Sequence, residues 1–298
     1  MGQKDTPIGK KVKAYIVFTK FRLAFSVVLS ALAGYLFADT APTTNYVHLF
    51  YLLVGGMLVT AASNGSNQIW ERDLDKLMKR TEKRPIPMGL MSLKEAYIVV
   101  ISALILGTYL LYLINVYSAI LGFLAYILYV FIYTPLKRVT PWAVFVGAVP
   151  GAIPPMLGAV AATNDFGLLP GVLFFVQFMW QFPHFWAIAW VLYDDYKAGG
   201  FSLLPSKSGR SKASAFQIVI YSLALVPFSL LPWFLGWTGT VSLIIASIFS
   251  LAFFMYAYKL LQSCETKDAR KLMFASFVYL PIIQFLYVFD RIESALPN

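Results

Sequence analysis

Carboxylates, an amide and bases gather at the end of the second long apolar run of this sequence. Asn67, Glu71 and Asp75 recur at intervals of four residues, so in a helix their side chains would lie along one face. Amide and carboxylate oxygens in a row are the ligands that a hard divalent cation such as Mg²⁺ prefers. Bases follow, among them Arg80 and Arg84, and bases suit an anionic leaving group. This segment is therefore a candidate site for a divalent cation and an anion.

A second acidic group, Asp194 and Asp195, follows a later apolar run that is rich in aromatic residues. A single acid at a helix end is usually solvated and paired with a neighbouring base. Two matched clusters at helix exits on one side of a membrane favour a shared site, because charge near a bilayer is costly and needs partners.

His184 stands about ten residues before Asp194, which places it roughly 15 Å deeper in a helix that rises 1.5 Å per residue. Its neighbours are proline and aromatic residues. Three roles are open to such a histidine: a satisfied hydrogen-bonding residue, a metal ligand or a proton carrier.

The composition indicates a polytopic helical membrane protein. Of the 298 residues, 59% are apolar and only 13% are charged, unlike a soluble domain. Read against a need for about 20 residues per span, the apolar runs predict an all-α fold of about nine transmembrane helices. These runs cover residues 21–38, 46–70, 96–114, 117–134, 141–162, 168–192, 213–236, 239–260 and 272–290.

The distribution of Lys and Arg predicts the orientation. With the N-terminus in the cytoplasm, 23 of the 24 bases fall on inner segments and only Arg291 falls on an outer one, as the positive-inside rule requires. The net charge of +10 is then a property of cytoplasmic loops. We therefore expect a single domain over residues 1–298, with a basic cytoplasmic segment at 1–20, in the inner membrane of the cell and with the site at its cytoplasmic side.

Several function classes find no support in the sequence. It has no basic, aromatic-interleaved module for nucleic acid, and no phosphate-binding glycine loop, zinc-ligand spacing or nucleophile elbow. A single cysteine, Cys264, allows no internal disulfide. The fifth apolar run contains Pro150, Pro154 and Pro155, so this helix must kink, either for packing or to line a cavity.

The first acidic motif resembles the Asn-x3-Asp-x3-Asp motif of the intramembrane aromatic prenyltransferases, the UbiA-type superfamily, with Glu71 at the middle position. The run from Trp70 to Pro87 is similar to the branch of that superfamily that modifies haem. The opening Lys20-Phe21-Arg22 resembles the Lys-Pro-Arg of that branch, with phenylalanine in place of proline. Further similar segments cover residues 133–141, 147–158, 183–186 and 194–200.

The second superfamily motif, Asp-x3-Asp-x3-Gly, is matched here only by Asp195 and Gly199, because Val191 stands at its first position. This departure matches the haem branch better than the branches that make quinones. The resemblance covers nearly the whole chain, roughly residues 10–290.

The resemblance implies nine helices around a central, lipid-open cavity, with farnesyl diphosphate and haem b as substrates and haem O as product. It further implies that Mg²⁺, the one cofactor, is held by Asn67, Glu71, Asp75 and Asp195, and that His184 holds the haem at iron or manages a proton. Mg²⁺ and bases would make diphosphate a good leaving group, and water would add after farnesyl transfer. The expected substrate-binding residues are Lys20, Arg22, Arg72, Arg80, Arg84, Lys137, Arg138, Asp194, Tyr196 and Lys197.

Partners and alternatives follow from the same residues. We expect the lipid bilayer and a downstream haem-modifying enzyme as partners. A first alternative is a prenyltransferase of the same fold that acts on an aromatic acid for quinone synthesis; His184 and the Asp194-Asp195-Tyr196 run argue against it. A second is a transporter whose inner acids bind cations, but the charge clusters lie at the inner face and not at the midplane.

Overall fold

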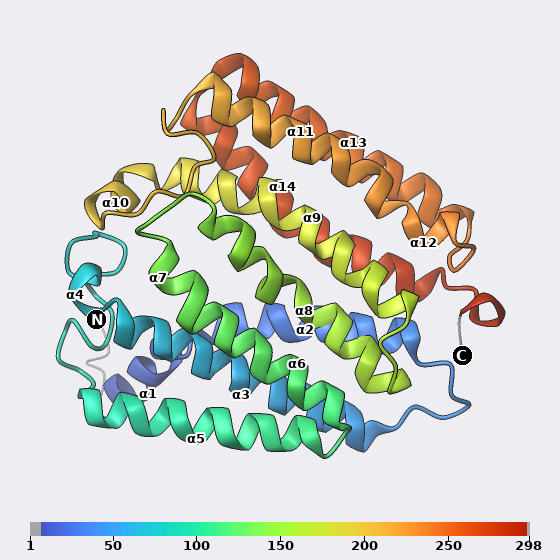
Figure 1. Ribbon diagram of the computed structural model, residues 1–298, viewed down its shortest axis with the longest axis horizontal. Coiled ribbons are helices and arrows are strands. Elements are labelled where there is room, and N and C mark those ends of the chain that lie inside the picture. Colours follow the sequence, from blue (N-terminus) through green and yellow to red (C-terminus); the bar gives the residue numbers. More distant parts are fainter. Residues whose placement is uncertain (1–6, 297–298) are drawn as a thin grey trace, which may run out of the picture.

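The computed structural model describes residues 7–296 of the chain, and these residues form helices and no named strand (Figure 1). Nine of the described helical segments are long and apolar enough to cross a membrane. Their bounds are α2 Phe21–Ala38, α3 Tyr46–Trp70, α5 Leu93–Tyr112, α6 to α7 Val116–Leu136, α8 Ala143–Thr163, α9 Leu168–Val191, α11 to α12 Lys212–Phe234, α13 Thr240–Ser263 and α14 Thr266–Phe289.

The predicted all-α fold with nine spans is confirmed, and the first two spans have the predicted bounds. The largest difference is in α14, which begins at Thr266 and not at residue 272. Its first two turns carry Asp268, Arg270 and Lys271, which hydropathy assigns to a loop although they are helical. The boundary between α5 and α6 is set by Asn115, whose side chain accepts a hydrogen bond from the Ser118 amide at 2.8 Å and caps the second helix.

The N-terminal segment contains a helix that hydropathy does not predict, α1 Pro7–Phe18. It is fixed to the start of α5 by Glu95, which pairs with Lys11 at 2.7 Å and accepts a hydrogen bond from the Tyr15 hydroxyl. Residues 1–6 of the predicted basic segment lie outside the described residues. The helix ends beside α3, where the Gln68 amide donates to the Phe18 carbonyl at 2.7 Å.

Helices α2 and α8 approach each other closely at two glycines. A Cβ atom on Gly158 would lie 1.9 Å from the Ala31 carbonyl oxygen, and one on Gly34 would lie 2.0 Å from the Pro155 carbonyl oxygen. Small residues allow helices to approach closely where lipid supplies no hydrophobic drive between them. This contact places the proline-rich α8 in the interior, next to α9.

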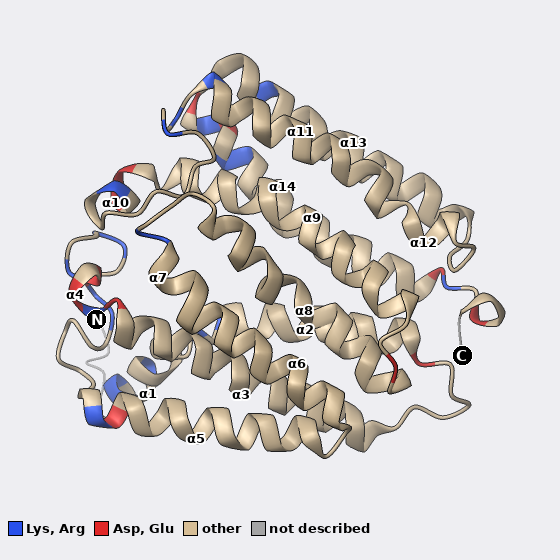
Figure 2. Ribbon diagram, viewed as in Figure 1, with Lys and Arg blue, Asp and Glu red and all other residues tan. Residues whose placement is uncertain are grey.

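Charged residues mark the two ends of the bundle (Figure 2). Most Lys and Arg residues lie at the end that carries the short helices α4 Arg72–Asp75, α7 Thr134–Leu136 and α10 Tyr193–Ala198. The opposite end carries Arg291 beside Glu293, at 2.5 Å, near the short helix η2 Glu293–Ala295. The two acidic motifs therefore share the basic end of the molecule.

Candidate active site

The first motif keeps its helical alignment although the helix is interrupted. Helix α3 ends at Trp70, and Glu71 (φ −94°, ψ 7°) joins it to the single turn α4. The Glu71 amide donates to the Asn67 carbonyl at 2.9 Å and the Asp75 amide to the Glu71 carbonyl at 2.8 Å. The spacing of four residues is thus preserved, as the sequence predicts for a helix that continues to Asp75.

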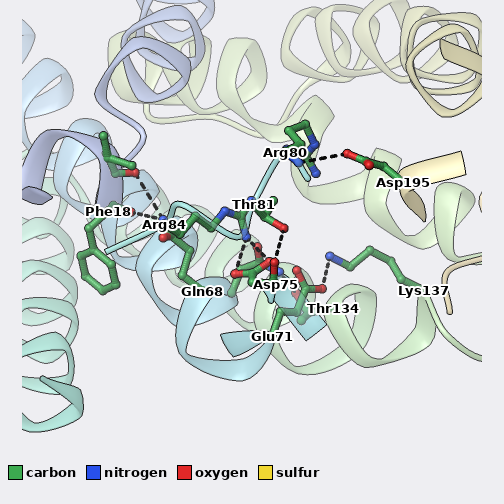
Figure 3. Close-up of polar contacts among 12 residues, drawn as sticks. Phe18, Gln68, Glu71, Asp75, Arg80, Thr81, Arg84, Thr134, Lys137 and Asp195 are labelled. Carbon is green, nitrogen blue, oxygen red and sulfur yellow. Dashed lines mark hydrogen bonds and ion pairs between the residues drawn. The ribbon is translucent and has the colours of Figure 1, made fainter. Parts of the chain in front are cut away.

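Each of the two buried carboxylates of this motif is paired with a base (Figure 3). The Arg84 Nη1 atom lies 2.7 Å from both oxygens of Asp75, and the Lys137 Nζ atom lies 2.5 Å from Glu71 Oε1. All four side chains are at most 10% exposed. Burial raises the pKa of Asp75, an effect that Arg84 opposes, and burial lowers the pKa of Lys137.

Asn67 connects this cluster to an irregular part of the fourth span. Its amide donates to Thr134 Oγ1 at 3.3 Å, and that hydroxyl donates to the Tyr129 carbonyl at 2.9 Å. Between α6 Val116–Ile127 and α7 the chain forms the π-helix η1 Leu128–Tyr133. A π-helical turn has wider spacing and commonly occurs at functional sites; here it precedes Lys137.

Lys20 approaches the same bases from the junction between α1 and α2. It has a left-handed backbone (φ 48°, ψ 51°), and the side chain of Asn64 holds the junction by donating to the Thr19 carbonyl at 3.2 Å. Burial and the charges of Arg84 and Lys137 lower the pKa of Lys20 to about 7. Three cations thus converge on two carboxylates, which leaves a surplus of positive charge for an anion.

The second motif meets the first through the loop that follows α4. Asp195 Oδ2 accepts a hydrogen bond from the Arg80 amide at 3.2 Å, and the Arg80 guanidinium lies 5.7 Å from the centre of the Tyr196 ring. Asp194 points away from this contact and pairs with Arg210 at 3.0 Å. The predicted residues Asp195 and Tyr196 are therefore adjacent to the cluster, whereas Asp194 is not.

Four predicted substrate-binding bases lie apart from the cluster. Arg22, Arg138 and Lys197 are exposed. Arg72 donates to the Ile69 carbonyl at 3.1 Å and lies beside the exposed Asp73. Their contribution to the site stays a prediction.

His184 lies between α9 and α14 and not beside the carboxylates. Its Nδ1 atom lies 2.7 Å from Ser276 Oγ, and its ring stacks on Trp180 with centroids 4.2 Å apart. Among the described residues the Nε2 atom has no hydrogen-bond partner. Only Nδ1 therefore takes part in the contact between α9 and α14. The predicted role in holding haem is left open by this geometry.

The donor set partly fits the expected Mg²⁺. Asn67, Glu71 and Asp75 offer buried oxygens on one face, 2%, 4% and 0% exposed, which suit a hard cation. Asp195 contacts the Arg80 amide instead. Within residues 7–296 no three Asp, Glu, His or Cys residues lie close enough together to hold a metal. The three donors of the first motif are therefore the ones that fit, once their bases move aside.

Sequence reasoning missed several polar residues that build this region. Thr81 fixes the loop by donating to the Asp75 carbonyl at 3.0 Å, and Thr134 links Asn67 to η1. Gln177, Gln181 and Gln284 are buried within the spans. The last three carried a signal, because an amide inside an apolar run is costly unless it is satisfied.

Within residues 7–296, nine apolar helices with a buried cluster of oxygens and bases at one end define a polytopic membrane protein that is suited to bind an anionic substrate. A profile of the UbiA prenyltransferase family matches residues 27–279. The chain belongs to this family and is thus a prenyltransferase.

Relatives of known name resemble the chain over almost its whole length. The protoheme IX farnesyltransferase of Cytophaga hutchinsonii is 46% identical over 286 residues, covering 96% of this chain and all of that protein. The protein of the same name from Flavobacterium psychrophilum is 48% identical and is covered at 96% of each chain.

Solved structures of low sequence identity share the fold. A digeranylgeranylglyceryl phosphate synthase matches with a TM-score of 0.79 and 21% identity, over 94% of this chain and 98% of that one. A UbiA homologue from Archaeoglobus fulgidus bound to GPP and Mg²⁺ matches with a TM-score of 0.67 and 17% identity, over 92% and 99%.

Proposed function

We propose that this chain transfers the farnesyl group of farnesyl diphosphate to a vinyl group of haem b, with addition of water, giving haem O and diphosphate. The observation that carries the proposal is the 46–48% identity to protoheme IX farnesyltransferases over 96% of the chain. The buried cluster of Glu71, Asp75, Lys137 and Arg84 supports it with a site suited to diphosphate. Membership of a prenyltransferase family favours an enzyme over the transporter alternative.

In this proposal the oxygen ligands of the cluster bind the metal and its bases bind the anion. Asn67, Glu71 and Asp75 would hold Mg²⁺, which when bound withdraws charge from the diphosphate and so weakens its bond to carbon. Lys137, Arg84 and Lys20 would turn to the diphosphate oxygens, because a bidentate or charge-assisted contact to phosphate is stronger than a neutral one. In the ligand-free chain Lys137 and Arg84 stay on the carboxylates, where each neutralises a buried charge.

The place of the reaction follows from the charge pattern. We propose a site at the cytoplasmic side of the cell inner membrane, because 23 of the 24 bases fall on that side of the predicted topology. The haem O released there would pass to a downstream haem-modifying enzyme.

Asp75→Asn and Asp73→Asn form a matched pair that tests this proposal. Purified protein in detergent, given farnesyl diphosphate, Mg²⁺, haem b and an aromatic acid as competing acceptor, should yield a haem with an added hydroxyethylfarnesyl group, measured by mass spectrometry. Asp75→Asn should lower kcat by about 10²–10³, the scale for losing one charge-stabilising group, whereas the exposed Asp73→Asn should not. Unchanged haem beside a prenylated aromatic acid would instead favour the quinone alternative.

A further inference from the structure

Besides Gln68 near the end of α3, three buried glutamines lie inside α9 and α14, where a carboxamide without partners is costly. Gln177 and Gln181 are on α9 and Gln284 is on α14, and each is at most 8% exposed. Their polar atoms need hydrogen-bonding partners that lipid cannot supply. Two of the three find those partners in the protein.

Gln177 and Gln284 compensate for a missing hydrogen-bond donor in the backbone of α8. Pro155 has no N–H, so the Gly151 carbonyl lacks its helical donor. The Gln177 amide supplies that donor at 2.5 Å, and the Gln284 amide donates to Gln177 Oε1 at 2.6 Å. These two residues therefore have a structural role.

Gln181 is not used in this way. It is 5% exposed, and among the described residues its carboxamide makes no hydrogen bond. Its side chain lies against Gly151. A Cβ atom added to that glycine would lie 2.5 Å from the Gln181 Nε2 atom. The chain therefore keeps a carboxamide without a protein partner on a 95% buried residue, in a place that only glycine leaves open.

The position of Gln181 relative to the anion site follows from α8. Gly147, one turn before Gly151 on the same face, packs against the Tyr133 ring, which a Cβ atom there would approach to 2.6 Å. The Lys137 Nζ atom lies 5.1 Å from the centre of that ring. Gln181 is thus about one helical turn, roughly 6 Å, further into the membrane than Tyr133.

We propose that the Gln181 carboxamide positions the water molecule that adds to the substrate during farnesyl transfer, an inference that rests on the function proposed above. As the bond from farnesyl C1 to the diphosphate oxygen breaks, the vinyl π electrons form the new carbon–carbon bond and leave a cation beside the porphyrin. The water oxygen supplies the electron pair for the carbon–oxygen bond, and its proton leaves with the diphosphate. A carboxamide can accept from this water and donate to it.

Loss of the positioned water has a specific consequence for the product. Without water at hand, the cation loses a proton from a neighbouring carbon and becomes an alkene. The product is then a farnesylated haem that is lighter by one water molecule. A residue with a purely structural role would lower the rate without changing the ratio of the two products.

Gln181→Met tests the proposal, because methionine has a similar length and no hydrogen-bonding amide. We expect the lighter, dehydrated product to become the major one, with Gln181→Glu restoring the hydrated product. Gln217→Met, on an exposed face of α11, is the matched control and should give the wild-type ratio. Gly151→Ala provides a second route, since it displaces the carboxamide without removing it.

The outcomes separate the two proposals. If the wild-type protein does not farnesylate haem b, the proposed function itself is wrong. A wild-type protein that makes hydrated product, with the same hydrated fraction in Gln181→Met or in Gly151→Ala, overturns the role of Gln181 alone. If Gln181→Met does not fold, as judged by its melting temperature in detergent, the product ratio of Gly151→Ala decides.

Discussion

At the scale of single residues, the site combines buried carboxylates with bases that neutralise them. Removing one partner of a buried pair leaves an uncompensated charge, at a cost of about 3–5 kcal/mol. Glu71 and Lys137 are such a pair, 5% and 10% exposed. The pairing stabilises the ligand-free chain and also competes with any cation for the Glu71 oxygens.

This competition predicts opposite effects of one substitution on two binding reactions. Lys137→Met should increase the affinity for Mn²⁺ alone by about tenfold, equivalent to 1.4 kcal/mol, because Glu71 loses its competing partner. With diphosphate present the same variant should bind the metal more weakly than wild type, because Lys137, one of the bases proposed to bind diphosphate, is missing. Electron paramagnetic resonance of free Mn²⁺ measures both affinities.

The exposed Lys76→Met is the control, since Lys76 pairs with Asp73 at the surface. It should leave both Mn²⁺ affinities at their wild-type values. Equal affinity for Mn²⁺ alone in Lys137→Met and wild type would show that the ion pair does not limit access of the cation.

Lys20 predicts a pH dependence of substrate binding. Its pKa is lowered to about 7 by burial and by the charges of Arg84 and Lys137, so it is cationic below that pH and neutral above it. The affinity for farnesyl diphosphate should therefore fall as pH rises through about 7, by roughly tenfold, the scale for one charge-assisted contact. Binding titrations between pH 6 and pH 8 test this expectation.

The comparison with Lys20→Gln removes the titration of the substrate itself, which is common to both proteins. The difference in affinity between wild type and Lys20→Gln should shrink above neutral pH, whereas the exposed Lys13→Gln should follow wild type throughout. If the difference in affinity stays constant from pH 6 to pH 8, Lys20 does not titrate in this range.

At the scale of elements, glycines decide how closely the helices that carry the site can pack. Gly158→Ala would place a Cβ atom 1.9 Å from the Ala31 carbonyl oxygen of α2, so one backbone must shift. Because overpacking costs about 1–3 kcal/mol and occasionally more, we expect a clear fall in melting temperature in detergent. The separation of α2 and α8 should also disturb Lys20, which precedes α2.

Gly171→Ala provides the contrast within α9, because nothing lies within 4 Å of its Cβ position. Replacing a helical glycine by alanine there should change stability by about 1 kcal/mol at most, in the stabilising direction. Similar melting temperatures for the two variants would contradict the close packing of α2 on α8.

The sequence predicts the elements well and their mutual contacts poorly. Hydropathy places the spans, because length and apolar content are local properties, and the spacing of Asn67, Glu71 and Asp75 predicts their common face. Pairing of Glu71 with Lys137 joins segments that are far apart in the sequence and separated by the π-helix η1, so no local pattern predicts it. Gln181 could not be placed from sequence either, because its surroundings depend on a glycine of another helix.

At the scale of the whole molecule, the asymmetry of charge predicts one orientation in the membrane. The end with α4, α7 and α10 collects the bases (Figure 2), and the positive-inside rule assigns that end to the cytoplasm. Cys264, the one cysteine of the sequence, follows α13 at the same end, just before the start of α14 at Thr266. It can therefore report the orientation without an introduced cysteine.

A membrane-impermeant maleimide should label Cys264 in inverted membrane vesicles and not in intact spheroplasts, because the partly exposed thiol faces the cytoplasm in the proposed topology. Thr43→Cys in a Cys264→Ser background should give the reverse pattern, since Thr43 is exposed in the loop between α2 and α3 at the opposite end. Labelling of Cys264 from outside would show that the molecule has the opposite orientation, with the carboxylate cluster at the outer face of the membrane. Farnesyl diphosphate would then have to reach the site from outside the cell, so the orientation decides from which compartment this site takes its charged substrate.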